Sequence, residues 1–334
     1  MTRRERVIAA LSHKQTDFVP YHTDFTLLEQ ERITKESGNP NYLAESGIHL
    51  HGAQFWGYPE EKGKAGYFTD DFGVTWNRSG IDKDIGVIDN CMIMEEDIGL
   101  YKTPYLNEKR LRAELDALVV TKGDQFTFAG IGFSMFERLW SYCGMENALI
   151  FMLSDPSFTH TLLDRICEFN CKVIDIINEY DLDGFYFGDD WGQQKGLIMG
   201  ASLWREFIKP RMRTMYDRAR KKGKFILQHS CGDIHEIMPD LIDIGLTCYQ
   251  TFQPEIYDIA NIKREYGKDL CFWGGISAQQ LLPYGTPQQV TDTVRRTIDI
   301  LGKGGGYIAA PAHAVSNDVP FANIDAMMKV FQNQ

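Results

Sequence analysis

The chain has 334 residues, of which 43% are hydrophobic and 24% are charged. This composition is typical of a globular protein with a large buried core, and it excludes a disordered or collagen-like chain. There are 46 acidic residues against 35 basic ones, a formal net charge of -11. Such a charge repels phosphate backbones and anionic lipid, so neither a nucleic-acid partner nor a membrane is expected. No run of eighteen apolar residues is present to span a bilayer.

The seven cysteines are an odd number, and their spacing along the chain is irregular. A chain of this length does not need disulfide bonds to hold a core together. The apolar run 7–11 near the start is too short for a signal peptide. We therefore expect a protein of the reducing cytoplasm.

The first third of the chain has a mixed pattern. An amphipathic helix is predicted over 3–12, followed by a turn at Asp17 and a first strand over 18–25 that ends in polar residues. A hairpin is predicted over 67–77. Residues 26–120 show no repeating unit, so we interpret them as an elaboration that covers one end of a core.

From residue 124 onward, short β-rich runs alternate with longer runs of helical period. The predicted strands are 125–130, 184–188, 224–228, 246–250, 269–274 and 306–310. The predicted helices are 156–180, 202–222, 234–244, 258–266, 287–302 and 321–333. Alternation of this kind means parallel strands with right-handed crossovers. Seven or eight such units favour an α/β fold of the (β/α)8 barrel type over an open doubly wound sheet, and no linker divides residues 1–334 into separate domains.

In a (β/α)8 barrel, the side chains that follow each strand meet at one mouth, where active sites lie. The chain places polar and reactive residues at these positions. They are His22, Asp24, Asp189, Asp190, Gln193, Gln194, His229, Cys231, Gln250, Gln253 and His313.

The sharpest of these signals is the segment His229-Ser230-Cys231-Gly232. Two residues at i and i+2 of an extended chain face the same side, so an imidazole and a thiolate there suit a zinc ion. His313, after the last strand, is the best candidate for a third ligand, which would leave one coordination position open for a reactant. The alternative is a hydrogen-bonded strand-end histidine beside a small buried cysteine.

Asp189 and Asp190 are the candidate catalytic carboxylates. Adjacent residues of an extended chain point in opposite directions, so we expect one of the two to face the mouth and the other to cap or orient the loop. A capping role alone is the alternative. The remaining candidates are predicted to bind substrate: His22, Asp24, Tyr186, Gln194, Gln250, Gln253 and Trp273.

Several segments together resemble the uroporphyrinogen decarboxylase superfamily, nearly from end to end and most weakly over about 30–120. They are 4–11 with 17–20, 187–194, 207–210, 229–232, 272–276 and 305–311. The superfamily fold is a (β/α)8 barrel, which agrees with the pattern of strands and helices. Its decarboxylases carry an arginine-rich stretch beside the first strand that holds tetrapyrrole carboxylates. Here residues 21–26 contain no arginine.

The methyltransferase branch of this superfamily carries His-x-Cys-Gly as zinc ligands, which His229 and Cys231 match. That branch adds a cysteine near the last strand, whereas this chain has no cysteine after Cys271 and offers Pro311-Ala312-His313. The resemblance implies a zinc-dependent methyltransferase working with a corrinoid (cobalamin) on a partner protein. Such an enzyme moves a methyl group from a methoxylated or methylated small molecule, as an O-demethylase does, or to a thiol. The alternatives are a uroporphyrinogen III decarboxylase, with Asp24 stabilising a protonated pyrrole, and a non-catalytic barrel that binds a small ligand.

Overall fold

The protein is a (β/α)8-type barrel, as predicted. The computed structural model describes residues 1–80 and 85–334. Its main sheet has seven parallel strands, in the order β1-β6-β7-β10-β11-β12-β13. Their bounds are β1 Leu50–Phe55, β6 Phe126–Ile131, β7 Gly184–Gly188, β10 Phe225–His229, β11 Cys248–Phe252, β12 Cys271–Ile276 and β13 Tyr307–Pro311. The six strands predicted after residue 124 are confirmed to within two residues.

The barrel closes through a segment that is not a regular strand. Tyr21 forms an isolated parallel bridge with Ala309 of β13, and its carbonyl oxygen accepts a hydrogen bond of 2.9 Å from the N–H of His49, just before β1. The prediction of a continuous strand over 18–25 is therefore wrong, since the segment forms only isolated bridges. Pro20 has no N–H to donate, and the segment divides its hydrogen bonds between two neighbours, so no continuous ladder forms.

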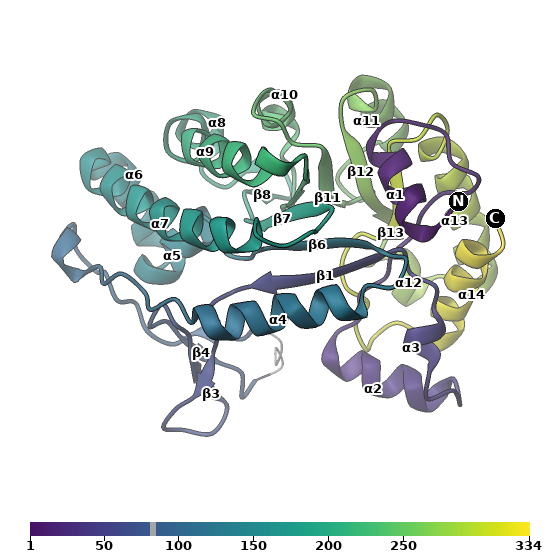
Figure 1. Cartoon of the computed structure of the whole chain (residues 1–334), viewed down its shortest axis with the longest axis horizontal. Coiled ribbons are helices and arrows are strands. Elements are labelled where there is room, and N and C mark those ends of the chain that lie inside the picture. The colour runs from purple at the N-terminus through teal and green to yellow at the C-terminus, as the bar shows by residue number, and fades with distance from the viewer. Residues whose placement is uncertain (81–84) are drawn as a thin grey trace.

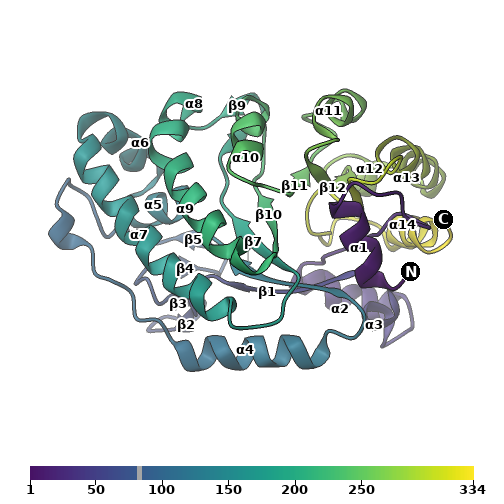
Figure 2. The same cartoon turned by 45° about the horizontal axis from the view of Figure 1, so that its top comes forward.

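Helices cover the outside of the barrel (Figures 1 and 2). The helices that the sequence predicted are α1 Arg3–Leu11, α7 Pro156–Ile177, α9 Lys209–Ala219, α10 Met238–Asp243, α11 Ile259–Tyr266, α13 Pro287–Leu301 and α14 Phe321–Gln332. The others are α2 Leu27–Glu36, α3 Tyr42–Glu45, α4 Glu108–Thr121, α5 Phe136–Cys143, α6 Met145–Ser154, α8 Gly200–Leu203 and α12 Leu281–Tyr284. One π turn, Trp204–Ile208, joins α8 to α9. Local signals set the long helices: a capping box at Thr286 and Gln289 begins α13, and Asp155 caps α7.

Residues 26–120 contain part of the barrel as well as an extra sheet. Strand β1 and helix α4 form a barrel unit that the sequence pattern did not reveal. Between them lies an antiparallel sheet of four short strands, β2 Glu60–Glu61, β3 Tyr67–Thr69, β4 Thr75–Asn77 and β5 Val87–Ile88. Strands β3 and β4 confirm the hairpin predicted over 67–77.

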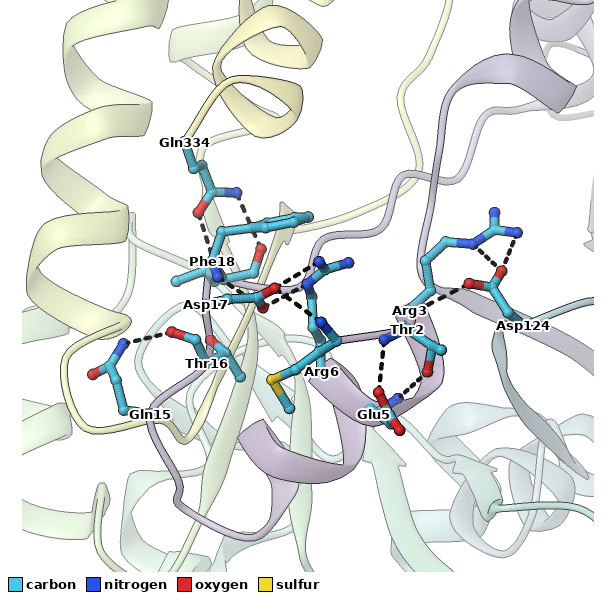
Figure 3. Close-up of polar contacts among 12 residues, drawn as sticks. Thr2, Arg3, Glu5, Arg6, Gln15, Thr16, Asp17, Phe18, Asp124 and Gln334 are labelled. Carbon is cyan, nitrogen blue, oxygen red and sulfur yellow. Dashed lines mark hydrogen bonds and ion pairs between the residues drawn. The ribbon is translucent and has the colours of Figure 1, made fainter.

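The amino-terminal end of the barrel is closed. Val7 and Leu11 of α1 pack into the hydrophobic cluster inside the barrel. Figure 3 shows the polar contacts at this end, in which Arg6 pairs with Asp17 at 2.7 Å and Arg3 with Asp124. Ligands must therefore enter at the opposite end, where the strands finish. No helix of the described residues is long and apolar enough to cross a membrane.

Candidate metal centre and active site

Strand β10 ends in a turn that carries His229 and Cys231 side by side. The Nε2 atom of His229 lies 3.6 Å from the Sγ atom of Cys231. The backbone N–H of Cys231 donates to Asp190 Oδ1 at 2.7 Å, and the N–H of Gly232 donates to Gln253 Oε1 at 2.8 Å. Gly232 has a positive φ of 78° and packs directly on the backbone of Gly192, so the turn has no room for a Cβ atom there.

His313, two residues beyond β13, completes the cluster expected from the sequence. One ligand atom each from His229, Cys231 and His313 lies within 4.8 Å of the others. Two nitrogens and one sulfur are a donor set that zinc prefers, and bonds of about 2.0 to 2.3 Å require only small side-chain rotations to close around an ion. The residues present therefore fit a zinc ion with an open position.

The orientation of His229 is set by its outer neighbours. Tyr186 donates its hydroxyl hydrogen to Gln250 Oε1 at 3.0 Å, which identifies this atom as an acceptor. The same oxygen lies against Nδ1 of His229, so Nδ1 carries the proton and donates it. Nε2 faces Cys231, and once Nε2 has lost its proton its lone pair is free to bind a metal. A hydrogen bond on the far side of the ring is how metal-binding histidines are normally held.

The thiol of Cys231 loses its proton more readily than that of an ordinary cysteine. Burial alone raises the pKa of a thiol, but the charge of His229 and hydrogen bonds from His229 and His313 outweigh it and lower the pKa of Cys231 to about 7. A thiolate is the form that binds a metal or attacks an electrophile. Near neutral pH, a large fraction of Cys231 is therefore thiolate, the form that could bind a metal.

The two adjacent aspartates have separate environments. Asp190 lines the mouth of the barrel. Burial raises the pKa of its carboxyl group, but hydrogen bonds with His229 and with the Cys231 backbone outweigh burial and lower this pKa to about 2. Asp189 is fully buried, and its carboxylate accepts three backbone N–H bonds of 2.9 to 3.1 Å at the start of α5, and one of 2.6 Å from Trp191. Burial raises the pKa of Asp189 to about 6. Only Asp190 is available to a ligand, and Asp189 caps α5.

A pocket that we call the inner cavity, of about 240 Å³, opens above the barrel interior. The predicted residues Asp24, Tyr186, Asp190, His229, Gln250 and His313 all line it. Its other lining residues are Gln54, Trp56, Ile85, Gly132, Phe133, Glu137, Gly188 and Ala314. The inner cavity thus gathers candidates from six different strands and loops beside the metal cluster.

A second pocket, the outer groove, lies on the other side of the cluster and measures about 630 Å³. Predicted residues Gln194 and Gln253 line it, together with Cys231 and His313. The remaining lining residues are Gly192, Gln193, Gly232, Ala278, Gln279, Ala314, Ser316 and Asp318. Since His313 and Ala314 border both pockets, the metal cluster lies between them.

His22 and Trp273 lie deeper in the barrel than predicted and line neither pocket among the described residues. Both are buried, and their rings meet edge to face with centroids 5.3 Å apart. Nε2 of His22 lies 3.0 Å from Oδ1 of Asp24. His22 therefore orients Asp24, and Trp273 packs behind His22.

Glu137 is the functional candidate that the sequence analysis missed. It is 9% exposed and lines the inner cavity from the first turn of α5. Burial, together with the charges of Asp190 and Asp189, raises its pKa well above the ordinary value. The sequence signal for Glu137 is its position in the loop and helix that follow the predicted strand 125–130.

With this geometry in place, comparison with known proteins identifies the family. The model of the uroporphyrinogen decarboxylase (URO-D) family matches residues 76–334, and the chain belongs to that family. A methylated-thiol–coenzyme M methyltransferase of Methanosarcina mazei is 24% identical over 186 residues, 56% of this chain. The match spans 47% of that relative's length. A solved methyltransferase structure from Methanosarcina mazei superposes with a TM-score of 0.75 at 16% identity, covering 99% of this chain and 98% of the other, and it shares the fold.

Proposed function

We propose that the protein is a zinc-dependent methyltransferase that acts with a corrinoid protein. It moves a methyl group from a methoxylated or methylated small molecule, or to a thiol. The observation that carries this proposal is the cluster of His229, Cys231 and His313 between two pockets at the open end of the barrel. The similarity to a methyltransferase acting on methylated thiols supports it.

His229, Cys231 and His313 would hold the zinc ion. When bound, zinc supplies a Lewis acid that polarises the heteroatom of a methyl donor or turns a thiol into a thiolate nucleophile. The protein's part is to position these ligands: Gln250 orients His229, and Asp190 holds the backbone at Cys231. Asp190, ionised and facing the inner cavity, would accept a hydrogen bond from a reactant there. Asp189 would act indirectly, by holding the start of α5.

The two pockets suit two different reactants. In the inner cavity, Asp24, Tyr186 and Gln250 would surround a small molecule beside the metal cluster. The outer groove is larger and presents the amides of Gln193, Gln194, Gln253 and Gln279. Amide groups both donate and accept hydrogen bonds, which suits the amide-bearing rim of a corrin ring carried by a partner protein.

A decarboxylase acting on uroporphyrinogen is the less favoured alternative. Its substrate carries several carboxylates, which proteins bind with arginine or lysine. Within residues 1–80 and 85–334, no arginine or lysine lines either pocket. Conversion of uroporphyrinogen by the purified protein would establish this alternative, and a non-catalytic binding barrel would show ligand binding with no turnover.

All seven cysteines are unpaired. Unpaired cysteines in this number are typical of a reducing compartment. We therefore infer that the enzyme works in the cytoplasm.

Metal analysis and methyl transfer together test the proposal. Protein purified without chelator should hold about one zinc ion per chain and should demethylate methylcobalamin in the presence of a thiol, followed by the cobalamin absorbance. His229→Ala and Cys231→Ala should lose both, whereas Cys91→Ser, at an exposed cysteine outside both pockets, should retain both. A wild-type protein without zinc, or variants with unchanged transfer, would refute the proposal.

A further inference from the structure

The inner cavity has an unusual charge for a pocket beside a cluster of metal ligands. Three carboxylates line it, those of Asp24, Glu137 and Asp190. Among its described lining residues there is no lysine or arginine. The nearby Arg138 is occupied elsewhere, since it pairs with Asp70 at 3.2 Å and donates to the carbonyl oxygen of Trp56. The cavity therefore offers no lysine or arginine to an anionic reactant, and its two histidines, His229 and His313, would be held by the metal.

Asp24 offers its charge directly to the cavity. Its side chain is 65% exposed, although the residue lies at the mouth of the barrel. Burial within the mouth favours the protonated form, but the neighbouring His22 outweighs it and lowers the pKa of Asp24. Only one of its oxygens contacts His22. The other oxygen remains available for a ligand.

Glu137 lines the same cavity from α5. It stands in the first turn of α5, and its raised pKa reflects burial and the repulsion of Asp190 and Asp189. A cation placed in the cavity would relieve this repulsion and favour the ionised carboxylate. The ionised carboxylate of Glu137 would attract a cationic ligand and repel an anionic one.

Aromatic rings form the rest of the wall. Trp56 and Phe133 lie with ring centroids 5.6 Å apart, and Tyr186 closes the barrel side. The indole of Trp56 lies directly over Gly132, where a Cβ atom would meet the ring at 3.0 Å. Aromatic faces attract ammonium groups and combine with carboxylates in sites that bind organic cations. The volume of 240 Å³ corresponds to about eight water molecules at roughly 30 Å³ each, so the ligand is small.

Building on the proposed function, we propose that the reactant in the inner cavity is a small aminothiol or its S-methyl derivative. Its sulfur binds at the cluster of His229, Cys231 and His313, and its ammonium group lies between Asp24 and Glu137. A free thiol releases its proton to solvent as the sulfur–metal bond forms. The same cavity rejects a thiol with a carboxylate tail, because that tail would meet the carboxylates with no basic partner.

The test uses the whole protein loaded with Co(II), whose thiolate absorption band reports sulfur binding. Three thiols share a two-carbon spacer and differ in the tail: 2-aminoethanethiol, 2-mercaptoethanol and 3-mercaptopropionate. We expect 2-aminoethanethiol to bind about tenfold tighter than 2-mercaptoethanol, and 2-mercaptoethanol to bind about tenfold tighter than 3-mercaptopropionate. Each tenfold difference in affinity corresponds to about 1.4 kcal/mol of binding free energy.

Asp24→Asn and Glu137→Gln should each reduce the preference for 2-aminoethanethiol over 2-mercaptoethanol about tenfold, which brings the two affinities close together. Asp299→Asn removes the same charge from an exposed position on α13 and should leave the order of the three thiols intact. Retained Co(II) content and circular dichroism show that the variants are folded. Equal or tighter binding of 3-mercaptopropionate by the wild-type protein would overturn the inference.

Failure of the proposed function gives a different result. A protein that takes up no Co(II) or zinc refutes the metal centre, and the charge preference is then measured by calorimetry with 2-aminoethanethiol and 3-mercaptopropionate. In that experiment a preference for the ammonium tail supports the inner cavity as a cation site. Equal heats for the two thiols overturn it.

Discussion

The inner cavity and the outer groove share the metal cluster but differ in their chemistry. The inner cavity has three carboxylates and three aromatic rings, whereas the outer groove has one carboxylate, that of Asp318, and four glutamine amides. The first suits a small charged reactant, and the second suits a larger neutral one. A methyl group passing between two reactants needs such a division, since each must reach the cluster without displacing the other.

The two pockets also depend on different structural supports. Helix α5, which carries Glu137, forms a wall of the inner cavity and is capped by Asp189. The floor of the outer groove rests on the close packing of Gly232 against Gly192. Substitutions can therefore damage one pocket at a time.

Asp189→Ala should destabilise the protein by about 3–5 kcal/mol, because three backbone N–H groups and the Trp191 indole lose a buried acceptor. Denaturant unfolding measures this loss. Asp190→Ala should cost much less stability, since its side chain is 34% exposed, but it should weaken the metal site. Equal losses for the two variants would contradict the division of roles between these aspartates.

Gly232→Ala should damage the outer groove. A Cβ atom would overlap the backbone of Gly192, and the φ of 78° is strained for alanine. We expect a loss of stability of about 2 kcal/mol or more and weaker zinc binding, because Cys231 lies in the same turn. Gly223→Ala, also at positive φ but with open space around it, is the matched control. A similar result for both glycines would show that φ alone is responsible.

Gln250→Leu should lower zinc affinity about 10- to 100-fold, since His229 loses the hydrogen bond that orients it. Competition with a coloured chelator measures the affinity. Gln250→Glu keeps an oxygen acceptor at this position and should restore most of the binding. Tyr186→Phe removes only the hydrogen bond to Gln250 and should have a smaller effect. An unchanged affinity in Gln250→Leu would show that His229 does not need this support.

Protein stripped of metal should react with iodoacetamide at Cys231 with a midpoint near pH 7, since the thiolate is the reacting form and its pKa is about 7. Below that pH, protons compete with the metal for Cys231 and also for His229. Burial lowers the pKa of His229, but Tyr186, Asp190 and Cys231 outweigh it and raise that pKa well above the ordinary value, so zinc affinity should fall by more than about tenfold for each pH unit. Mass spectrometry of the alkylated peptide gives the midpoint. His229→Ala removes the charge that lowers the pKa and should move the midpoint upward, and a midpoint that stays at pH 7 would contradict this cause.

The regular half of the molecule was predictable because its signals are local. Alternation of β-rich runs with capped helices identified six strands and the helices between them, and His229-Ser230-Cys231 placed two ligands on one face. The first half was harder, because β1 contains His51, Gly52 and Gln54 and lacks the apolar run of a buried strand. The segment 18–25 has a strand-like composition, yet it forms only isolated bridges.

The site was predictable only in part for the same reason. Asp24, Tyr186, Gln250 and His313 line the inner cavity, since each lies in or just beyond a strand or the segment that closes the barrel. Glu137 was missed because its importance comes from burial beside Asp190, which lies 53 positions away in the chain. No local pattern reports a contact of that kind.

Local patterns were enough to predict the barrel class and the two candidate metal ligands His229 and Cys231, because strand period, helix caps and an i, i+2 spacing act over a few residues. Tertiary structure decided which aspartate faces the mouth, where Glu137 lies and how the space around the cluster divides in two. Those features depend on the packing of chain segments that are distant in sequence, and only the closed barrel brings them together.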